Sequence, residues 1–264
     1  MRKSYPSDIT KKQFEIVRKD LEQATKSTHP RKYDLYDIFC AVLYLIKEGC
    51  SWRAIPHDFP KWENVRYHYD IWSKEDDNGI SLLDKVLRKL VKAERERQGR
   101  ETNTTMLIID SKTTQNADTA ETKGYDAAKK SGIKIHIGVD ILGLPHMIML
   151  TPADVTDRKG AIWMIEYYSD VTENLKSLIK VMADGGYTGK NFSDSVNELC
   201  RAEVEIVKRN ELHTFVVLPK RWIVERSFAW LDKCRRLWKN CERKLHTSFQ
   251  MVTLAFIRLL LNRY

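Results

Sequence analysis

The stretch MLIIDSK at residues 106–112 carries the clearest fold signal in the chain. Its apolar residues run directly into the carboxylate of Asp110, and a fully apolar run this short suits a strand buried on both faces. A charge inside such a strand is costly unless it is paired or binds a metal ion. We therefore expect Asp110 to end the strand at the edge of the core and to point into a site. A plain turn after the strand would show the same pattern.

The composition points to an anionic partner. The chain has 264 residues, enough for one large domain or for a small and a medium one, and a net charge of +9. This basic surplus favours nucleic acid before an anionic membrane, although a merely basic soluble protein would also fit. The 5 cysteines include no Cys-x-x-Cys pair, which argues against a disulfide framework and a structural zinc site.

No targeting or membrane segment is expected. The first residues, MRKSYP, lack the apolar core of a secretory signal. No stretch approaches the roughly 18 uncharged apolar residues of a membrane-spanning helix. These features predict a cytoplasmic protein without a membrane partner.

The first hundred residues are expected to be helical. Apolar residues recur at helical spacing after the possible N-cap residues Ser7 and Asp34, and Gly49 would end the second helix. Further helices are expected over about 61–73 and about 80–98.

Short helices joined by tight turns are typical of a helix-turn-helix. The segment GCSWRAIP at 49–56 would provide the first helix and turn, and helix 61–73, with basic and aromatic residues, would read DNA. A small bundle that only supports the next domain is the alternative. The polar segment that follows Gly99 predicts a boundary between a helical DNA-binding domain, 1–100, and a second domain, 101–264.

The second domain alternates strands and helices. Apolar periodicity predicts, in order, strands at 106–110, 133–140 and 146–151, a helix at 157–171, a strand at 177–183, a helix at 191–201, a strand at 204–207, a long helix opened by Pro219 and a last helix at about 248–261. This order predicts an α/β fold with a mixed sheet and matches that of the ribonuclease-H-like fold. Asp184 would end the fourth strand and meet Asp110 at one rim, because neighbouring parallel strands bring their carboxyl ends together.

Glu225 is the candidate third carboxylate. It lies on the long helix among aromatic residues, and Arg221 one turn earlier could pair with it or hold a phosphate. Phosphodiester chemistry with two Mg²⁺ ions needs carboxylates that hold the ions about 3.5–4 Å apart, and hard oxygen ligands suit Mg²⁺. A surface ion pair is the alternative for Glu225. Asp140 is the best substitute acid, whereas Asp157 is expected to cap a helix.

A basic segment follows Glu225. Between Lys220 and Lys244 basic residues outnumber acidic ones, with Trp230 and Trp238 interleaved. Such a segment beside the carboxylates would bind phosphates and could stack an unpaired base. A solvated basic face is the alternative.

Three motifs carry a family resemblance over nearly the whole chain. They are IDSK at 109–112, ADGGYTG at 183–189 and RWIVERSFAWL at 221–231. Together they resemble those of bacterial DDE transposases of the insertion sequence five family, and the N-terminal WRAIP at 52–56 resembles that family's helical DNA-binding domain.

The resemblance implies a ribonuclease-H-like domain that cuts and joins the ends of its own element. Asp110, Asp184 and Glu225 match the catalytic triad and would hold two Mg²⁺ ions, for which Mn²⁺ could substitute. The implied partners are double-stranded DNA, as element ends and target, and a second copy of the chain at synapsis, in the bacterial nucleoid. The residues expected to contact DNA are Arg53, Arg66, His68, Lys112, Lys220, Arg221, Arg226, Lys233, Arg235 and Arg236.

Two other functions remain open at this level. A decayed or domesticated transposase would hold DNA without cutting it, although all three acids are present. A nuclease or RNA-cleaving enzyme of the same fold would cut without joining, although a helical N-terminal domain suits duplex DNA better than RNA.

Overall fold

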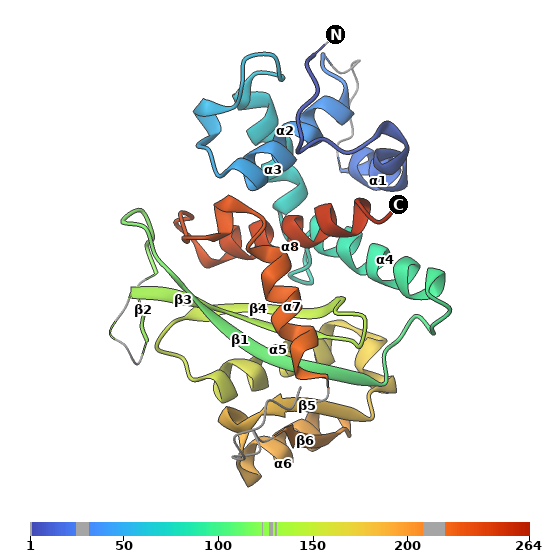
Figure 1. Ribbon diagram of the computed structural model, residues 1–264, viewed down its shortest axis with the longest axis vertical. Coiled ribbons are helices and arrows are strands. Elements are labelled where there is room, and N and C mark those ends of the chain that lie inside the picture. The colour runs from blue at the N-terminus through green and yellow to red at the C-terminus, as the bar shows by residue number, and fades with distance from the viewer. Residues whose placement is uncertain (1, 25–31, 123, 127–128, 130, 208–219) are drawn as a thin grey trace, which may run out of the picture. The chain divides into compact units, whose positions relative to one another are not determined.

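The computed structural model describes residues 2–24, 32–122, 124–126, 129, 131–207 and 220–264 (Figure 1). The chain forms two compact units. A helical unit contains Met1–Leu90, Leu231–Lys239 and Gln250–Tyr264, and a sheet unit contains Val91–Trp230 and Asn240–Phe249. The predicted functional boundary near residue 100 stays a prediction. In the structure the two units divide between Leu90 and Val91, inside a helix. Residues 231–239 and 250–264, near the C-terminus, belong to the helical unit.

The helical unit is built from short amphipathic helices. Its elements are α1 (Lys11–Gln23), α2 (Leu35–Glu48), the 3-10 helix η1 (Trp52–Ala54), α3 (Trp62–Ser73), the first part of α4 (Leu82–Arg97), the 3-10 helix η4 (Arg235–Leu237) and most of α8 (Leu245–Leu261). Predicted helices 61–73 and 80–98 are thereby confirmed as α3 and α4.

Helix ends follow local capping chemistry. The Asp34 carboxylate accepts the Tyr36 N–H and caps α2, and Gly49 ends that helix in the left-handed conformation, as predicted. Ser7 was the wrong cap for α1. The cap is Thr10, which forms a capping box with Gln13 three residues later.

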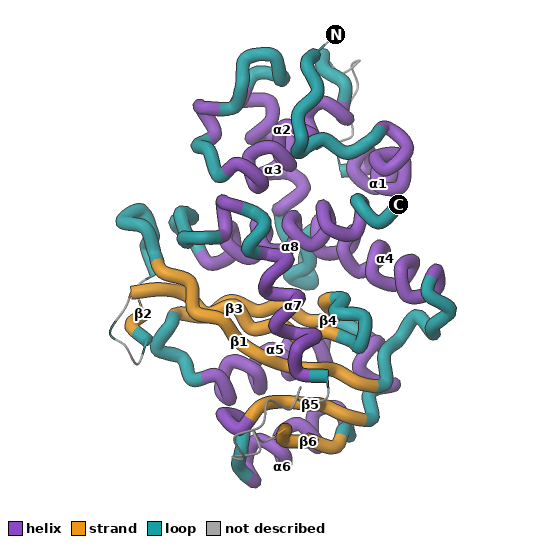
Figure 2. Tube along the Cα trace, viewed as in Figure 1, coloured by secondary structure: helices purple, strands orange, loops and turns teal. Residues whose placement is uncertain are grey.

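The sheet unit contains one mixed sheet, whose strands are orange in Figure 2. Its elements are β1 (Met106–Gln115), β2 (Gly124–Tyr125), β3 (Ser131–Val139), β4 (Pro145–Pro152), α5 (Asp157–Val171), the 3-10 helix η2 (Glu173–Ser177), β5 (Lys180–Asp184), the 3-10 helix η3 (Gly185–Tyr187), α6 (Lys190–Cys200), β6 (Glu203–Val207) and α7 (Arg221–Leu231). β3 pairs antiparallel with β4 and β1, whereas β1, β5 and β6 are parallel. The predicted ribonuclease-H-like order is confirmed, with the short β2 as an addition. Pro219, predicted to open the long helix, lies outside the described residues.

Two strand boundaries differ from the sequence prediction. β1 does not end at Asp110, because its polar half continues to pair with β3 as far as Gln115 opposite Gly132. Only the pairing of β1 with β5 stops earlier, at Ile108 opposite Met182. The fourth predicted strand begins later than expected, at Lys180, because residues 173–177 form η2.

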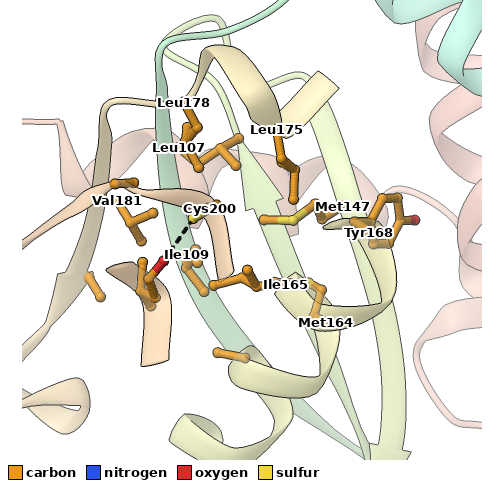
Figure 3. Close-up of a cluster of buried hydrophobic side chains, with 14 of the residues drawn as sticks. Leu107, Ile109, Met147, Met164, Ile165, Tyr168, Leu175, Leu178, Val181 and Cys200 are labelled. Atoms are coloured by element: carbon orange, nitrogen blue, oxygen red, sulfur yellow. Dashed lines mark hydrogen bonds between the residues drawn. The ribbon is translucent and has the colours of Figure 1, made fainter. Parts of the chain in front are cut away.

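Helices α5 and α6 cover one face of the sheet. Leu107 and Ile109 of β1 and Val181 of β5 point into a buried cluster with Met164 and Ile165 of α5 (Figure 3). Because side chains alternate along a strand, Ile108, Met182 and the two aspartates face the other way. That second face meets α7, whose Ile223, Val224 and Phe228 are buried.

The start of α5 corrects another capping prediction. The Thr156 hydroxyl, rather than Asp157, accepts the Lys159 N–H and caps the helix. Asp157 is the first helical residue, and its carboxylate is held by other partners. None of the described helices is both long and apolar enough to cross a membrane.

Candidate active site

Asp110 and Asp184 occupy corresponding positions on adjacent parallel strands. The register of β1 and β5 places Ile108 opposite Met182, and each aspartate follows two residues later. A two-residue step keeps a side chain on the same face, and neighbouring strands lie about 4.8 Å apart. Both carboxylates therefore lie on the same face of the sheet, just beyond the paired part of the two strands.

A pocket opens at these two residues. It has an empty volume of about 250 Å³ and combines both aspartates with an apolar floor from three strands and α7. Its lining residues are Ile108, Ile109, Asp110, Met182, Ala183, Asp184, Val207 and Val224. Apolar walls lower the local polarity, which strengthens electrostatic interactions at the carboxylates.

Backbone amides orient both carboxylates. Asp110 Oδ1 accepts the N–H of Ser111 at 2.8 Å, and Asp184 Oδ1 accepts the N–H of Gly186 at 2.8 Å. The second contact makes Asp184 the cap of η3, so the strand end and the turn after it form one unit.

Glu225 lies on α7 next to the pocket-lining Val224, but its own side chain is exposed. Residues Ile223, Val224 and Phe228 of the same helix are buried. Glu225 is thus on the helix that meets the aspartate face, without lining the pocket itself.

The two carboxylates are oxygen donors of the kind that suits Mg²⁺. Among the described residues, no group of three or more His, Cys, Asp or Glu side chains is placed to hold a metal ion. Mg²⁺ usually takes only one or two protein carboxylates and completes its shell with water and substrate phosphates. The pair Asp110 and Asp184 fits that mode.

A second polar network lies against β1 from the α5 side. The Ser111 hydroxyl donates to Asp157 Oδ1 at 2.7 Å, and Lys134 Nζ contacts the same oxygen at 2.8 Å. Burial opposes the charge of Asp157, but Lys134 and Ser111 outweigh it and hold the pKa of Asp157 below its ordinary value. Asp157 is therefore a charged structural partner of the strand that carries Asp110.

Asp140, the substitute acid expected from sequence, has a structural role. It is fully buried and forms an ion pair with Arg95, and its Oδ1 accepts the N–H groups of Leu142 and Leu144. Burial alone would raise the pKa of Asp140, but the His146 contact, the backbone amides and Arg95 together lower it. Its oxygens hold the β3–β4 turn to α4.

The predicted DNA-contacting residues of the sheet unit have different surroundings. Arg226 is half-buried between the rings of Trp222 and Trp230 and donates to the Leu142 carbonyl at 3.0 Å. Lys220 is exposed, and Lys112 is half-buried on the Asp110 face of β1. Arg221 begins α7, and its side chain lies outside the described part of the structure.

Three more of these residues surround η1 and α3 in the helical unit. Arg53 is exposed near the ring of Trp62. Arg66 pairs with Asp70 at 2.7 Å and lies over Trp52, whereas His68 is half-buried.

The last three lie in the segment 231–239, which packs on α2 in the helical unit. Arg235 pairs with Glu48 at 3.1 Å, and Arg236 donates to the Cys50 carbonyl at 2.9 Å. Lys233 is exposed, and its carbonyl accepts Lys47 Nζ. The basic segment 220–244, continuous in sequence, is thus divided between the two units.

The sequence prediction missed the support around the carboxylates. Sequence patterns do not single out Ser111, Lys134 or Tyr187, and they predict a helix cap for Asp157. Ser111 lies in the motif at 109–112 and Tyr187 in the motif at 183–189. Their closeness in sequence to Asp110 and Asp184 is the signal that could have pointed to them. Lys134 gives none, because Lys134 on β3 meets Asp157 only through the packing of the start of α5 on that strand.

Family comparisons agree with this arrangement. Residues 101–260 match the family described as "Transposase DDE domain", and residues 9–77 match "Putative transposase of IS4/5 family". The chain therefore belongs to the DDE transposases of the IS4/5 type.

Individual relatives are more distant. The "Putative transposase for insertion sequence element IS402" of Burkholderia cepacia is 31% identical over 126 residues, which cover 46% of this chain and 59% of that relative. A cryo-EM structure of the piggyBac transposase synaptic complex with hairpin DNA aligns with 97% of this chain and 73% of that chain, at 13% identity and a TM-score of 0.44.

Proposed function

We propose that the chain is a DNA transposase that binds the terminal inverted repeats of its insertion sequence and catalyses metal-dependent strand cleavage and strand transfer. The observation that carries the proposal is the pair Asp110 and Asp184, each two residues beyond the last paired residues of adjacent parallel strands and both lining one pocket, in a chain of the DDE family.

The three acids have distinct tasks in this proposal. Asp110 and Asp184 bind divalent cations directly, and their N–H contacts fix the orientation of both carboxylates. Glu225 completes the set from α7 once DNA and cations are bound. We assign two Mg²⁺ ions, with Mn²⁺ as a substitute; when bound, they would neutralise charge on the phosphodiester and help deprotonate the attacking water or 3′-hydroxyl.

Basic residues in both units bind the duplex. In the helical unit the proposed contacts are Arg53, Arg66, His68, Lys233, Arg235 and Arg236, and in the sheet unit they are Lys112, Lys220, Arg221 and Arg226. Phosphate contacts of this kind fix the register on DNA and make binding salt-dependent. Joining two element ends requires two active sites, so we propose a homodimer at synapsis, acting in the bacterial nucleoid.

Cleavage of a labelled duplex that carries the element's own ends tests the proposal. Wild type and Glu225→Gln are compared in Mg²⁺ or Mn²⁺. Glu198→Gln is the matched control, because Glu198 is also an exposed helical glutamate of the sheet unit. We expect cuts at the ends for wild type and the control and none for Glu225→Gln.

A decayed transposase is the second candidate. The observation that favours it is the exposed position of Glu225 outside the pocket lining. Specific binding to the ends without cuts by the wild type would support it. Cuts without joining to a target duplex would instead indicate a nuclease of the same fold.

A further inference from the structure

Two arginines of the helical unit lie over tryptophan rings beside helix α3. The Arg53 guanidinium is 5.5 Å from the centroid of the Trp62 ring, and the Arg66 guanidinium is 5.0 Å from that of Trp52. Both distances lie within the roughly 6 Å of a cation–π contact, which holds a guanidinium near the ring. The two arginines differ in what their N–H donors already bind.

Arg66 is engaged within its own helix. Its Nε donates to the Asp70 carboxylate at 2.7 Å, one turn further along α3. A charge-assisted hydrogen bond of this kind fixes the direction of the guanidinium. Arg66 therefore has fewer donors left for the edge of a base.

Arg53 keeps its donors. The residue is exposed, and among the described residues its side chain forms neither an ion pair nor a hydrogen bond. The five N–H groups of the guanidinium are thus available in their fixed fork geometry. A preorganised fork loses little side-chain entropy for each hydrogen bond that it forms.

The packing of η1 places Arg53 at the N-terminal end of α3. Trp52, the residue before it, packs against the buried Tyr69 of α3 with ring centroids 5.0 Å apart. Trp62 is the first residue of α3, so the contact with its ring holds the Arg53 guanidinium at that end. α3 is the helix predicted to read DNA, and in a helix-turn-helix the N-terminal residues of that helix contact base edges.

The free fork of Arg53 favours one base. Guanine presents two acceptors, O6 and N7, in the major groove, and a bidentate arginine contact to them is the commonest specific one. Adenine presents N7 beside an N6 donor, and thymine presents a single acceptor, so neither matches two parallel donors. The chemistry that fits Arg53 is therefore a guanine edge.

We propose that Arg53 reads a guanine of the terminal inverted repeat through this bidentate contact, that the Trp62 ring preorganises it, and that Arg66 contacts only the phosphate backbone. The inference rests on the proposed binding of the terminal repeats, and it assigns the residue that discriminates between bases there.

The test combines protein variants with a change of one acceptor in the DNA. Anisotropy titrations without divalent cation measure the Kd of wild type, Arg53→Lys, Arg66→Lys and Trp62→Leu for a duplex that carries the element's end. The same titrations use copies of that duplex in which each guanine in turn is replaced by 7-deazaguanine, which pairs normally but lacks the N7 acceptor. Lysine keeps the charge of arginine and removes its fork.

Arg18→Lys is the matched control. Arg18 belongs to α1 of the same unit, and its guanidinium also lies over an aromatic ring, that of Phe14, at 4.9 Å. It is not among the residues proposed to contact DNA. Its replacement should change neither the Kd nor the response to 7-deazaguanine.

We expect a guanine at which 7-deazaguanine raises the wild-type Kd about tenfold and leaves that of Arg53→Lys unchanged, because the fork is already gone. Arg66→Lys should bind all duplexes more weakly and respond to 7-deazaguanine as wild type does. Trp62→Leu should lose part of the wild-type response, because the ring no longer holds the guanidinium. Arg53 is exposed, so the Tm of Arg53→Lys should equal that of wild type.

An equal response of Arg53→Lys and wild type at every guanine would overturn the inference. So would a response that disappears in Arg66→Lys instead, and a full wild-type response in Trp62→Leu would overturn the role of the ring. The proposed function fails differently, because wild type would then bind the element's end no more tightly than a scrambled duplex of the same length.

Discussion

Asp110 and Asp184 each stand two residues beyond the point where Ile108 of β1 faces Met182 of β5. The two acids are therefore placed by the strands that carry them. A substitution that removes the charge of one acid should reduce cleavage without changing the stability of the sheet.

Asp110→Asn should lower the rate of end cleavage by more than about 100-fold, the upper range for groups that only support a metal ligand. The amide keeps the size of the side chain but loses its charge, so binding to the terminal repeats should be preserved. A gel assay of cleavage and a filter assay of binding measure the two effects. Cleavage at the wild-type rate would remove Asp110 from the site.

Asp140→Ala should act on stability instead. Removing one partner of a buried ion pair leaves Arg95 uncompensated and typically costs about 3–5 kcal/mol. Urea unfolding of Asp140→Ala, Arg95→Ala and the double variant measures the coupling between the two residues. If the two single effects simply add, the ion pair does not hold the β3–β4 turn to α4.

Stability should also fall on acidification below about pH 6.5 because of His136. Burial lowers the pKa of His136 to about 4, Asp157 raises it and Lys134 lowers it. The unfolded chain binds this proton near its ordinary pKa of about 6.5, so the unfolding free energy drops by up to roughly 3 kcal/mol between pH 7 and pH 4.

The corresponding measurement is urea unfolding at several pH values for wild type and His136→Gln. Glutamine cannot titrate and can still reach Thr151, whose hydroxyl lies 2.9 Å from His136 Nε2. The free energy of unfolding of His136→Gln should change less with pH between pH 7 and pH 4 than that of wild type. An unchanged slope would assign the acid sensitivity to other groups.

Gly160→Ala should destabilise the sheet unit, because a methyl group at this position of α5 would collide with the His136 ring. Overpacking of this kind typically costs about 1–3 kcal/mol. Gly185→Ala is the control, since its added methyl would meet nothing within 4 Å. A loss in Gly160→Ala no larger than that in Gly185→Ala would show that the collision with His136 is relieved.

Lys233 and Arg236 should respond differently although they are close in sequence. Lys233→Ala should reduce the salt dependence of DNA binding, with the slope of log K against log salt falling by about 0.9 for one lost phosphate contact. Arg236→Ala should reduce that slope as well and should in addition destabilise the helical unit by about 1–3 kcal/mol, because its hydrogen bond to the Cys50 carbonyl is lost. Anisotropy titrations and urea unfolding separate the two effects. An unchanged slope for Lys233→Ala would show that this lysine faces away from DNA.

Local sequence was enough to predict most elements. α2 is fixed by Asp34, by its apolar face and by Gly49, all within one stretch of chain. β5 ends at Asp184 as expected, since the apolar run stops there. Where local signals competed, as with Ser7 and Thr10, the reciprocal bond from Gln13 decided the helix start.

Non-local pairing decided what the pattern left open. The polar half of β1 reads as a loop by itself and becomes a strand because β3 supplies its hydrogen bonds. Asp140 and Asp110 both follow apolar strand residues, and only Arg95 and His146 make Asp140 structural.

By itself, the sequence determined the order of strands and helices, the candidate acids and the resemblance to DDE transposases, because these depend on periodicity and on motifs within short windows. Only the tertiary structure decided that Asp110 and Asp184 share a pocket and that segment 231–239 packs with the helical unit. Those relationships join residues far apart in the chain, and strand register and burial, which no short window encodes, bring them together.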